Sequence, residues 1–173
     1  MPMIYRGRVV DFLVEEVHLP NGRTVSFEMV RHPGAAAVVP MRDDGRVVLI
    51  RQHRHAAGGM IYEIPAGRID PGETPMECAK RELAEETGWR AARWDSLGMI
   101  WTTPGFTDEK IHLFLARGLE PAPRSLEPDE IIELEERSME DAIGMIRRGE
   151  INDGKTICAL MRAYFEIKDG SLQ

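Results

Sequence analysis

Short runs of β-branched and aromatic residues, separated by turn signals, occupy the first two thirds of the chain and predict strands. Two such runs flank a Leu-Pro-Asn-Gly turn signal at residues 19–22, which predicts an N-terminal antiparallel hairpin within residues 5–32. A second hairpin is predicted from the runs at residues 35–40 and 46–52, on either side of Asp-Asp-Gly. Further strands are predicted at residues 63–66, 97–102, 111–116 and 131–135.

Three other stretches predict helices. The first begins at Thr74, where Thr-Pro-x-Glu supplies an N-cap, a proline at the first helical position and Glu77 for a capping box, and it ends near Gly88. The second runs from about Ser138 to Gly149 and reads as an amphipathic cover on the sheet. The third has an apolar stripe at helical spacing that is expected to lie in the core or in an interface. That stripe consists of Ile157, Leu160, Met161, Tyr164 and Phe165.

The interleaving of strands and helices predicts an α/β fold in which helices cover both sides of a mixed sheet. A length of 173 residues suits a single domain, here residues 1–173. Within it, residues 1–33 hold the N-terminal hairpin and residues 34–173 form the core. Residues 121–128 contain three prolines and are predicted to form a loop.

Composition and charge exclude several classes of protein. The longest apolar runs fall far short of the roughly 20 residues that cross a bilayer, so no membrane span is expected. The start of the chain lacks the features of a secretory signal, and the default expectation is a cytoplasmic protein. A formal charge of −7 argues against broad binding to nucleic acid. Cys78 and Cys158 both lie in helical patterns and are expected to be reduced, partly buried thiols.

The most informative stretch is residues 67–89, which includes the first predicted helix. At about 100° per residue, Glu82, Glu85 and Glu86 fall on one arc of that helix. Like charges at this spacing repel one another, so something else must neutralise them. Hard divalent cations such as Mg²⁺ prefer oxygen ligands, and three converging carboxylates meet that need. Arg81, one turn before Glu85, is expected to form a salt bridge with it and to orient the cluster.

An acidic run on a helix is usually a solvated face, which is the alternative to a metal site. The residues, however, match the pattern G-x5-E-x7-R-E-U-x-E-E-x-G-U, where U is apolar, at every fixed position. The polar and glycine positions alone would coincide by chance at roughly one starting point in 10⁸. The matching residues are Gly67, Glu73, Arg81, Glu82, Leu83, Glu85, Glu86, Gly88 and Trp89. Trp89 is bulkier than the usual aliphatic residue.

This stretch is the Nudix box, and the chain therefore resembles the Nudix hydrolases. The resemblance implies their fold, an α/β/α sandwich around a mixed β-sheet in which the box forms a loop, a helix and a second loop. Residues 63–67 (Glu-Ile-Pro-Ala-Gly) and residues 103–109 (Thr-Pro-Gly-Phe-Thr-Asp-Glu) resemble the ADP-ribose pyrophosphatase branch. In that branch a proline lies about 15 residues past the box, and Pro104 satisfies this. The similarity covers roughly residues 31–135 well and the ends only in outline.

The resemblance also implies roles for the carboxylates. Glu82 and Glu86 are expected to be the principal metal ligands, with the Ala66 carbonyl and Glu85 completing sites for two or three Mg²⁺ or Mn²⁺ ions per active site. An additional glutamate from a mobile loop acts as base or metal ligand in this branch. Glu130 is favoured for that role over Glu127. The alternative is that both are solvated turn residues.

Substrate contacts are implied in the same way. Arg54 corresponds to a phosphate-binding arginine, and a guanidinium suits that task because its planar fork grips phosphate oxygens. Arg31 and Glu109 are expected to contact the distal or ribosyl part of the substrate, although each could be an ordinary surface charge. Contacts are also expected from the loop residues Pro104, Gly105 and Phe106.

The expected activity is hydrolysis of ADP-ribose to AMP and ribose 5-phosphate. GDP-mannose or another nucleotide sugar remains an alternative, because the box reports diphosphate chemistry and not the base or the sugar. A ligand-sensing module without catalysis is a second alternative. Such modules commonly lose box carboxylates, whereas this chain keeps all of them. A decapping or RNA-processing activity is disfavoured by the acidic charge. The resemblance further implies a homodimer in which the N-terminal hairpin crosses to the partner.

Overall fold

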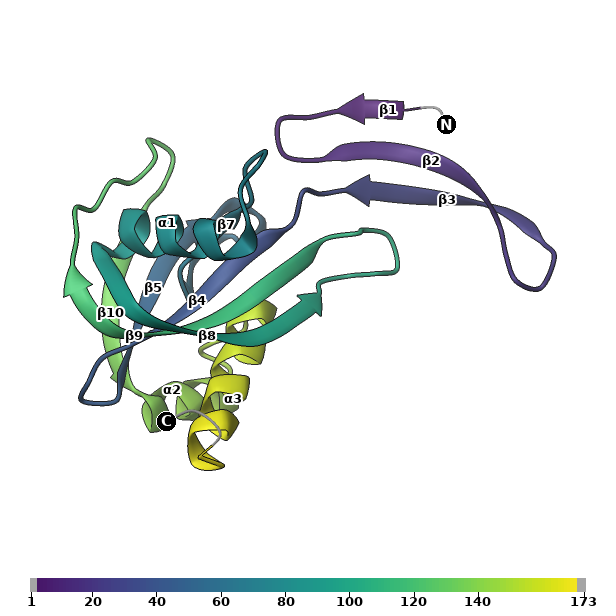
Figure 1. The fold of residues 1–173 in the computed structure, drawn as a ribbon. Coiled ribbons are helices and arrows are strands. Elements are labelled where there is room, and N and C mark those ends of the chain that lie inside the picture. Colours follow the sequence, from purple (N-terminus) through teal and green to yellow (C-terminus); the bar gives the residue numbers. More distant parts are fainter. Residues whose placement is uncertain (1–2, 171–173) are drawn as a thin grey trace.

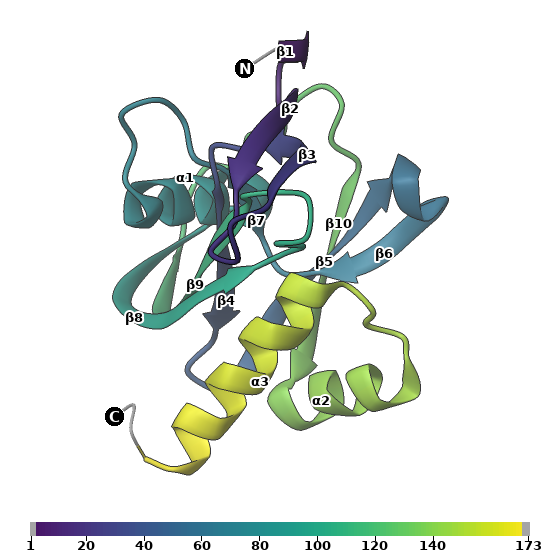
Figure 2. The same cartoon turned by 90° about the vertical axis from the view of Figure 1, so that its right-hand side faces the viewer.

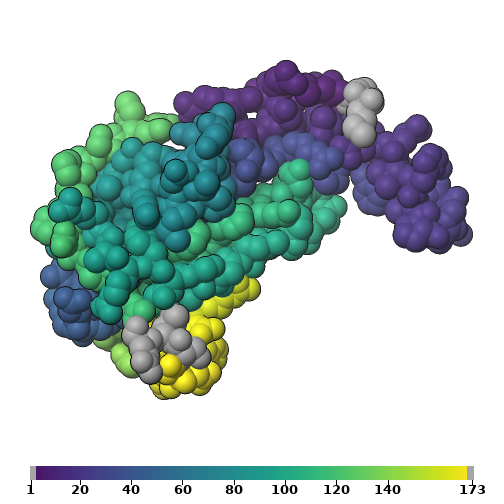
Figure 3. Space-filling view, viewed as in Figure 1, coloured from purple at the N-terminus to yellow at the C-terminus, as the bar shows by residue number. Residues whose placement is uncertain are grey.

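A computed structural model describes residues 3–170 of the chain, and its first element is a three-stranded antiparallel sheet (Figure 1). The strands are β1 (Met3–Arg6), β2 (Asp11–His18) and β3 (Thr24–Arg31). The predicted hairpin is therefore confirmed as β2 and β3. Strand β1 was not predicted, since it is short and no turn signal follows it. The N-terminal sheet extends away from the rest of the molecule (Figure 3).

The central sheet has seven strands and is mixed, as predicted. Strand β4 pairs in parallel with β9, and the other pairs are antiparallel. The order is β10-β5-β4-β9-β8, with β6 added to β5 and β7 added to β4. These strands are β4 (Ala35–Met41), β5 (Arg46–Arg54), β6 (Gly59–Glu63), β7 (Ala66–Arg68), β8 (Trp89–Trp101), β9 (Lys110–Pro121) and β10 (Ile132–Ser138), with a short 3-10 helix (His55–Ala57) between β5 and β6.

Two strand predictions need correction. The strand expected at residues 63–66 is a break between β6 and β7, because Pro65 has no N–H for a ladder and its carbonyl instead accepts a hydrogen bond from Val38 N at 2.9 Å. Strand β8 starts at Trp89, directly after the first helix, and not at residue 97. Its early part is rich in arginine and alanine and lacks a strand signal, but it pairs with β9 from Trp89 opposite Pro121 onward.

All three predicted helices are present, and a side chain caps the N-terminus of each. Helix α1 (Pro75–Thr87) has the complete capping box of Thr74 and Glu77 and ends at Gly88, whose φ of 72° suits glycine. Helix α2 (Met139–Arg148) is capped by Ser138. Helix α3 (Gly154–Lys168) is capped by Asp153.

The helices form two outer layers around the central sheet (Figures 1 and 2). On one face, Leu83 of α1 packs with Val38 and Phe114 of the sheet. On the other face, α2 and α3 pack against Leu49 and Leu113. The α/β/α sandwich is therefore confirmed. Of the stripe predicted on α3, Leu160 lies in the core, whereas Phe165 is 53% exposed, so its place in an interface stays a prediction. The fully buried residues of α3 are Thr156, Ala159, Leu160 and Ala163.

Both cysteines are free, with Cys78 buried and Cys158 half-buried. Across residues 3–170, no helix has the length and apolar character needed to cross a membrane.

Candidate active site

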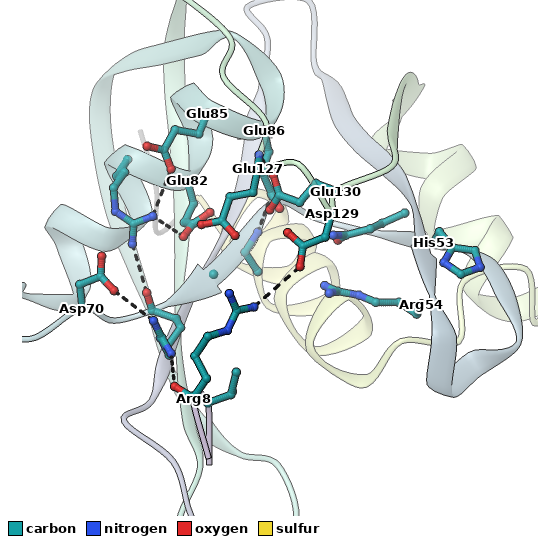
Figure 4. A pocket seen from close by; sticks show the side chains of 16 residues that line it. Arg8, His53, Arg54, Asp70, Glu82, Glu85, Glu86, Glu127, Asp129 and Glu130 are labelled. Carbon is teal, nitrogen blue, oxygen red and sulfur yellow. Dashed lines mark hydrogen bonds and ion pairs between the residues drawn. The ribbon is translucent and has the colours of Figure 1, made fainter. Parts of the chain in front are cut away.

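A pocket of about 360 Å³ lies where α1, β7 and the end of β5 approach the loop before β10 (Figure 4). It brings together residues that are far apart in the sequence, including the predicted Arg54 and Ala66 and the five glutamates predicted as metal ligands or base. The lining residues are Arg8, Val9, Gln52, His53, Arg54, Ala66, Gly67, Arg68, Asp70, Arg81, Glu82, Glu85, Glu86, Glu127, Asp129 and Glu130.

Two of the three box carboxylates on α1 are buried in the wall of this pocket. Glu82 is 7% exposed and Glu86 only 1% exposed. Burial raises the pKa of Glu82 to about 7, against the opposing effect of Arg81. Burial and the neighbouring charge of Glu82 raise the pKa of Glu86 well above its ordinary value. Unlike a solvated acidic face, these two carboxylates lie in surroundings that penalise their negative charge.

Arg81 links the box loop to the carboxylates. Its guanidinium donates to Glu73 at 2.9 and 3.0 Å, to Glu82 at 2.5 Å and to Glu85 at 3.1 Å. It also donates to the Arg68 carbonyl at 3.1 Å. The predicted ion pair of Arg81 with Glu85 is thus confirmed. Glu73 in turn accepts a hydrogen bond from the Asp70 amide at 3.0 Å, so it braces the box loop.

The loop carboxylates occupy the opposite side of the pocket, in the segment between β9 and β10. Glu130 accepts a hydrogen bond from the Glu127 amide at 2.8 Å, and its own amide donates to the Glu127 carbonyl at 3.0 Å. Its side chain is therefore folded back on its own loop. The charge of Glu130 nevertheless contributes to the raised pKa values of Glu82 and Glu86, which places it within electrostatic reach of both.

Arg54 is the last residue of β5, which continues beyond the predicted end at residue 52. Its guanidinium donates to both oxygens of Glu63, at 2.7 and 2.8 Å. Figure 4 shows the Arg54 side chain extending into the carboxylate pocket. The Glu63 carboxylate also accepts a hydrogen bond from Lys155 at the start of α3.

A second, more open pocket of about 710 Å³ adjoins the first and shares Arg54, Ala66, Gly67 and Arg68 with it. Its lining includes the predicted Glu109, whose carboxylate lies 3.5 Å from His32 Nδ1. The other lining residues are Ala35, Ala56, Ala57, Ile61, Glu63, Ile100, Trp101, Thr102, Ile111, Asp153, Gly154, Lys155 and Cys158.

A family model described as the NUDIX domain matches residues 30–160. The chain belongs to this family. A relative named ADP-ribose pyrophosphatase, from Bacillus subtilis (strain 168), is 40% identical over 96% of this chain and 90% of its own length. A relative named GDP-mannose pyrophosphatase, from Cronobacter sakazakii (strain ATCC BAA-894), is 37% identical over 77% of this chain and 78% of its own.

A solved structure titled as an ADP compounds hydrolase superposes with a TM-score of 0.85 at 22% identity. The match covers 98% of this chain and 92% of the chain in that structure. This likeness confirms the NUDIX fold.

NUDIX hydrolases generally use divalent metal ions, and the donor set of the pocket fits one. The donors are oxygen atoms, which hard cations prefer, and Glu82 lies directly against the backbone of Gly67. A Cβ atom added at Gly67 would lie 1.8 Å from Glu82 Oε1, so the close approach requires glycine. Within residues 3–170 no three His, Cys, Asp or Glu side chains are already gathered around one point. Arg81 and the Ala66 amide, at 2.9 Å from Glu86 Oε2, bind these oxygens instead, so a cation requires carboxylate reorientation.

Four of the predicted substrate residues line neither of these two pockets. Arg31 pairs with Glu15 at 2.5 Å and with Asp108 at 2.8 Å, near the N-terminal sheet. Pro104, Gly105 and Phe106 lie in the loop between β8 and β9. The Phe106 carbonyl accepts a hydrogen bond from Val30 on β3 at 2.8 Å, and its side chain is 53% exposed.

Several lining residues of the NUDIX pocket were not predicted. Arg8 reaches it from the connection between β1 and β2 and lies 3.7 Å from Asp129, an acid in the same loop as Glu130. No local pattern marks Arg8, because only the tertiary fold brings this connection to the box. The Asp-x-Lys-Thr segment at the start of α3 was likewise not predicted to have a role, although Lys155 contacts Glu63.

Proposed function

We propose that this chain hydrolyses the diphosphate bond of a nucleotide sugar, and that ADP-ribose is its preferred substrate. Water is added across the bond, giving AMP and ribose 5-phosphate. The observation that carries the proposal is the pair of buried carboxylates, Glu82 and Glu86, in one pocket with Arg54. The similarity to the Bacillus subtilis ADP-ribose pyrophosphatase favours ADP-ribose over other substrates.

The residues proposed to hold the metal are Glu82 and Glu86, together with the Ala66 carbonyl, Glu85 and Glu130. We expect two or three Mg²⁺ ions per site, with Mn²⁺ as a substitute. When bound, such ions lower the pKa of a water molecule and offset charge on the phosphates. The raised pKa values of Glu82 and Glu86 are consistent with this role. Burial disfavours the negative charge of these carboxylates, and a bound cation would supply the positive charge that stabilises it.

The other residues of the pocket bind substrate and move a proton. Arg54 donates to phosphate oxygens from the edge of its guanidinium that does not face Glu63. Glu130, once released from the Glu127 amide, accepts a proton from the attacking water at a carboxylate oxygen. Glu127 is the alternative base. The second pocket, with Ile100 and Trp101 in its wall, holds the part of the substrate beyond the diphosphate.

We also propose that the protein is a homodimer. The N-terminal sheet extends from the body (Figure 3). Large apolar side chains on this sheet and on its β1–β2 connection are exposed to solvent. These are Met3, Ile4, Tyr5, Val9 and Phe27. Exposed apolar area of this kind is typical of a surface that another chain covers, and a crossing hairpin would then bring Arg31 and its neighbours to the partner's substrate. Light scattering that gives the mass of a monomer contradicts this part of the proposal.

The test is a hydrolysis screen with the purified protein and Mg²⁺. ADP-ribose, GDP-mannose, NADH, Ap4A and capped RNA are compared by kcat/KM, and products are separated by chromatography. We expect AMP and ribose 5-phosphate from ADP-ribose, with activity lost in EDTA. A higher kcat/KM for GDP-mannose would assign the chain to the activity for which the Cronobacter relative is named. Absence of hydrolysis for every diphosphate contradicts the enzymatic proposal and favours a ligand-sensing module.

A further inference from the structure

The start of α3 holds a charged cluster that the proposed chemistry does not use. Asp153 caps the helix, and one of its oxygens accepts hydrogen bonds from the Thr156 amide at 2.9 Å, the Thr156 hydroxyl at 2.6 Å and Lys155 Nζ at 3.0 Å. Lys155 also donates to Glu63, so one ammonium group bridges two carboxylates. The Lys155 side chain is 12% exposed and that of Glu63 is 2% exposed. This is a buried arrangement and not a surface ion pair.

The same segment is fastened to the connection that leads into the Nudix box. The Thr156 hydroxyl accepts a hydrogen bond from the Ile64 amide at 3.0 Å, and both residues are fully buried. Ile64 lies between Glu63 and the Pro65-Ala66 step, and the Ala66 amide donates to Glu86. The first turn of α3 thus contacts both the side chain of Glu63 and the backbone that follows it.

Glu63 is shared between Lys155 and Arg54. Its Oε2 atom accepts hydrogen bonds from both residues, while its Oε1 atom accepts one from Arg54 Nε at 2.7 Å. Burial acts to raise the pKa of Glu63, but Arg54 and Lys155 outweigh it and the pKa is lowered. The carboxylate is therefore ionised, and its negative charge is shared between the two cations.

We propose that Lys155 is a positioning residue for the hydrolysis, one that shares the Glu63 carboxylate with Arg54 and so keeps the Arg54 guanidinium available to substrate phosphate. The inference rests on the proposed function. Its physical basis is the charge of the cluster, in which two acids, Glu63 and Asp153, are balanced by Arg54 and Lys155. Without the ammonium group, one uncompensated negative charge faces an incoming anion.

The experiment replaces Lys155 by methionine, which keeps the length of the side chain and removes its charge. We expect KM for the diphosphate substrate to rise about tenfold, while kcat changes by less than about 3-fold. A role in folding alone would instead lower the amount of active enzyme and leave KM unchanged. Lys168→Met is the matched control, because Lys168 is an exposed lysine at the other end of the same helix, and it should leave both constants unchanged.

A second variant separates charge balance from local packing. In Glu63→Gln/Lys155→Met the acid and the base are removed together, so the cluster is again balanced. We expect KM to fall at least about 3-fold from that of Lys155→Met. If the single variant does not fold, the comparison moves to the Glu63→Gln background, where replacing Lys155 should change KM by less than about 3-fold because the carboxylate that it shares with Arg54 is gone.

The outcomes are distinct. Wild-type protein that turns over no diphosphate contradicts the proposed function itself. Active wild type with an unchanged KM in Lys155→Met overturns the positioning role alone, as does a double variant whose KM rises above that of the single variant. A change in KM of about 5-fold or more when Lys155 is replaced in the Glu63→Gln background also overturns it.

Discussion

The pocket has two walls that carry glutamates in very different settings. Glu82 and Glu86 on α1 form the helix wall, and Glu127 and Glu130 in the loop before β10 form the loop wall. On α1, Glu82 and Glu86 are buried, and their oxygens are held by Arg81 and by the Ala66 amide. In the loop before β10, Glu127 is exposed and Glu130 is bonded to its own loop. A glutamate on the helix is fixed by the fold, whereas a glutamate in the loop is free to move without disturbing the core.

This difference fits the different roles proposed for the two walls. A cation site benefits from carboxylates that the fold keeps close to the binding position, so that only their side chains reorient when the cation binds. A proton acceptor must reach the water and then release the proton, which suits a residue on a segment of low local stability. Under the proposed function, α1 would supply the static charge and the loop the movable one.

The largest predicted effect is on the helix wall. Glu86→Gln should lower metal-dependent kcat/KM by about 10³-fold or more, because the metal contributes several kcal/mol to the transition state and about 1.4 kcal/mol corresponds to tenfold. The amide oxygen of glutamine can still accept the Ala66 hydrogen bond, so folding should persist. Steady-state kinetics with Mg²⁺ measure the effect, and circular dichroism checks the fold. Glu140→Gln, an exposed acid on α2, is the control, and equal activity in both variants would remove Glu86 from the site.

A smaller effect is predicted on the loop wall. Glu130→Gln should lower kcat by about 10²-fold with little change in thermal stability, as expected for loss of a general base. Glu127→Gln is the matched control in the same loop and should change kcat by less than about 3-fold. The reverse ranking would transfer the role to Glu127. If neither variant slows turnover, the loop supplies no base and the contrast between the two walls disappears.

Much of the helix wall could be predicted because its signals are local. The capping box of Thr74 and Glu77, the glycine at the end of α1 and the spacing of the acids each act within a few residues. The ion pair of Arg81 with Glu85 follows from the same spacing. The sequence of the Nudix box was therefore enough to predict most of the helix wall.

The parts that could not be predicted depend on contacts between distant segments. Arg8 reaches the pocket only because the N-terminal sheet folds beside the box, and Lys155 meets Glu63 across a large part of the chain. At the break, the Pro65 carbonyl accepts a hydrogen bond from the Val38 amide, and the periodicity of the sequence does not reveal this partner. Arg31 was expected near substrate, but within one chain it pairs with Glu15 and Asp108.

The smallest predicted effect is on stability. It tests whether ionisation of a buried glutamate on the helix wall destabilises the fold, in contrast to an exposed glutamate on the loop wall. The pKa of Glu82 in the folded protein is raised from 4.5 to about 7, so the folded carboxyl holds its proton more tightly than the unfolded one. Its contribution to stability is thus fully present below pH 4.5 and is lost as the pH rises through about 7. Glutamine cannot ionise and avoids this loss. In EDTA, Glu82→Gln should therefore have a higher Tm than wild type at pH 8, by a few °C, and nearly the same Tm at pH 4.

Calorimetric scans of both proteins across this pH range, with and without Mg²⁺, provide the measurement. Added Mg²⁺ should raise the Tm of wild type more than that of Glu82→Gln, because the ion stabilises the ionised carboxylate that the variant lacks. Glu127→Gln is the control from the exposed wall and should leave Tm unchanged at every pH. A wild-type Tm at pH 8 equal to or above that of Glu82→Gln without metal would mean that Arg81 alone compensates the buried charge. The helix wall would then need no cation to be stable, and its burial would no longer distinguish it from the loop.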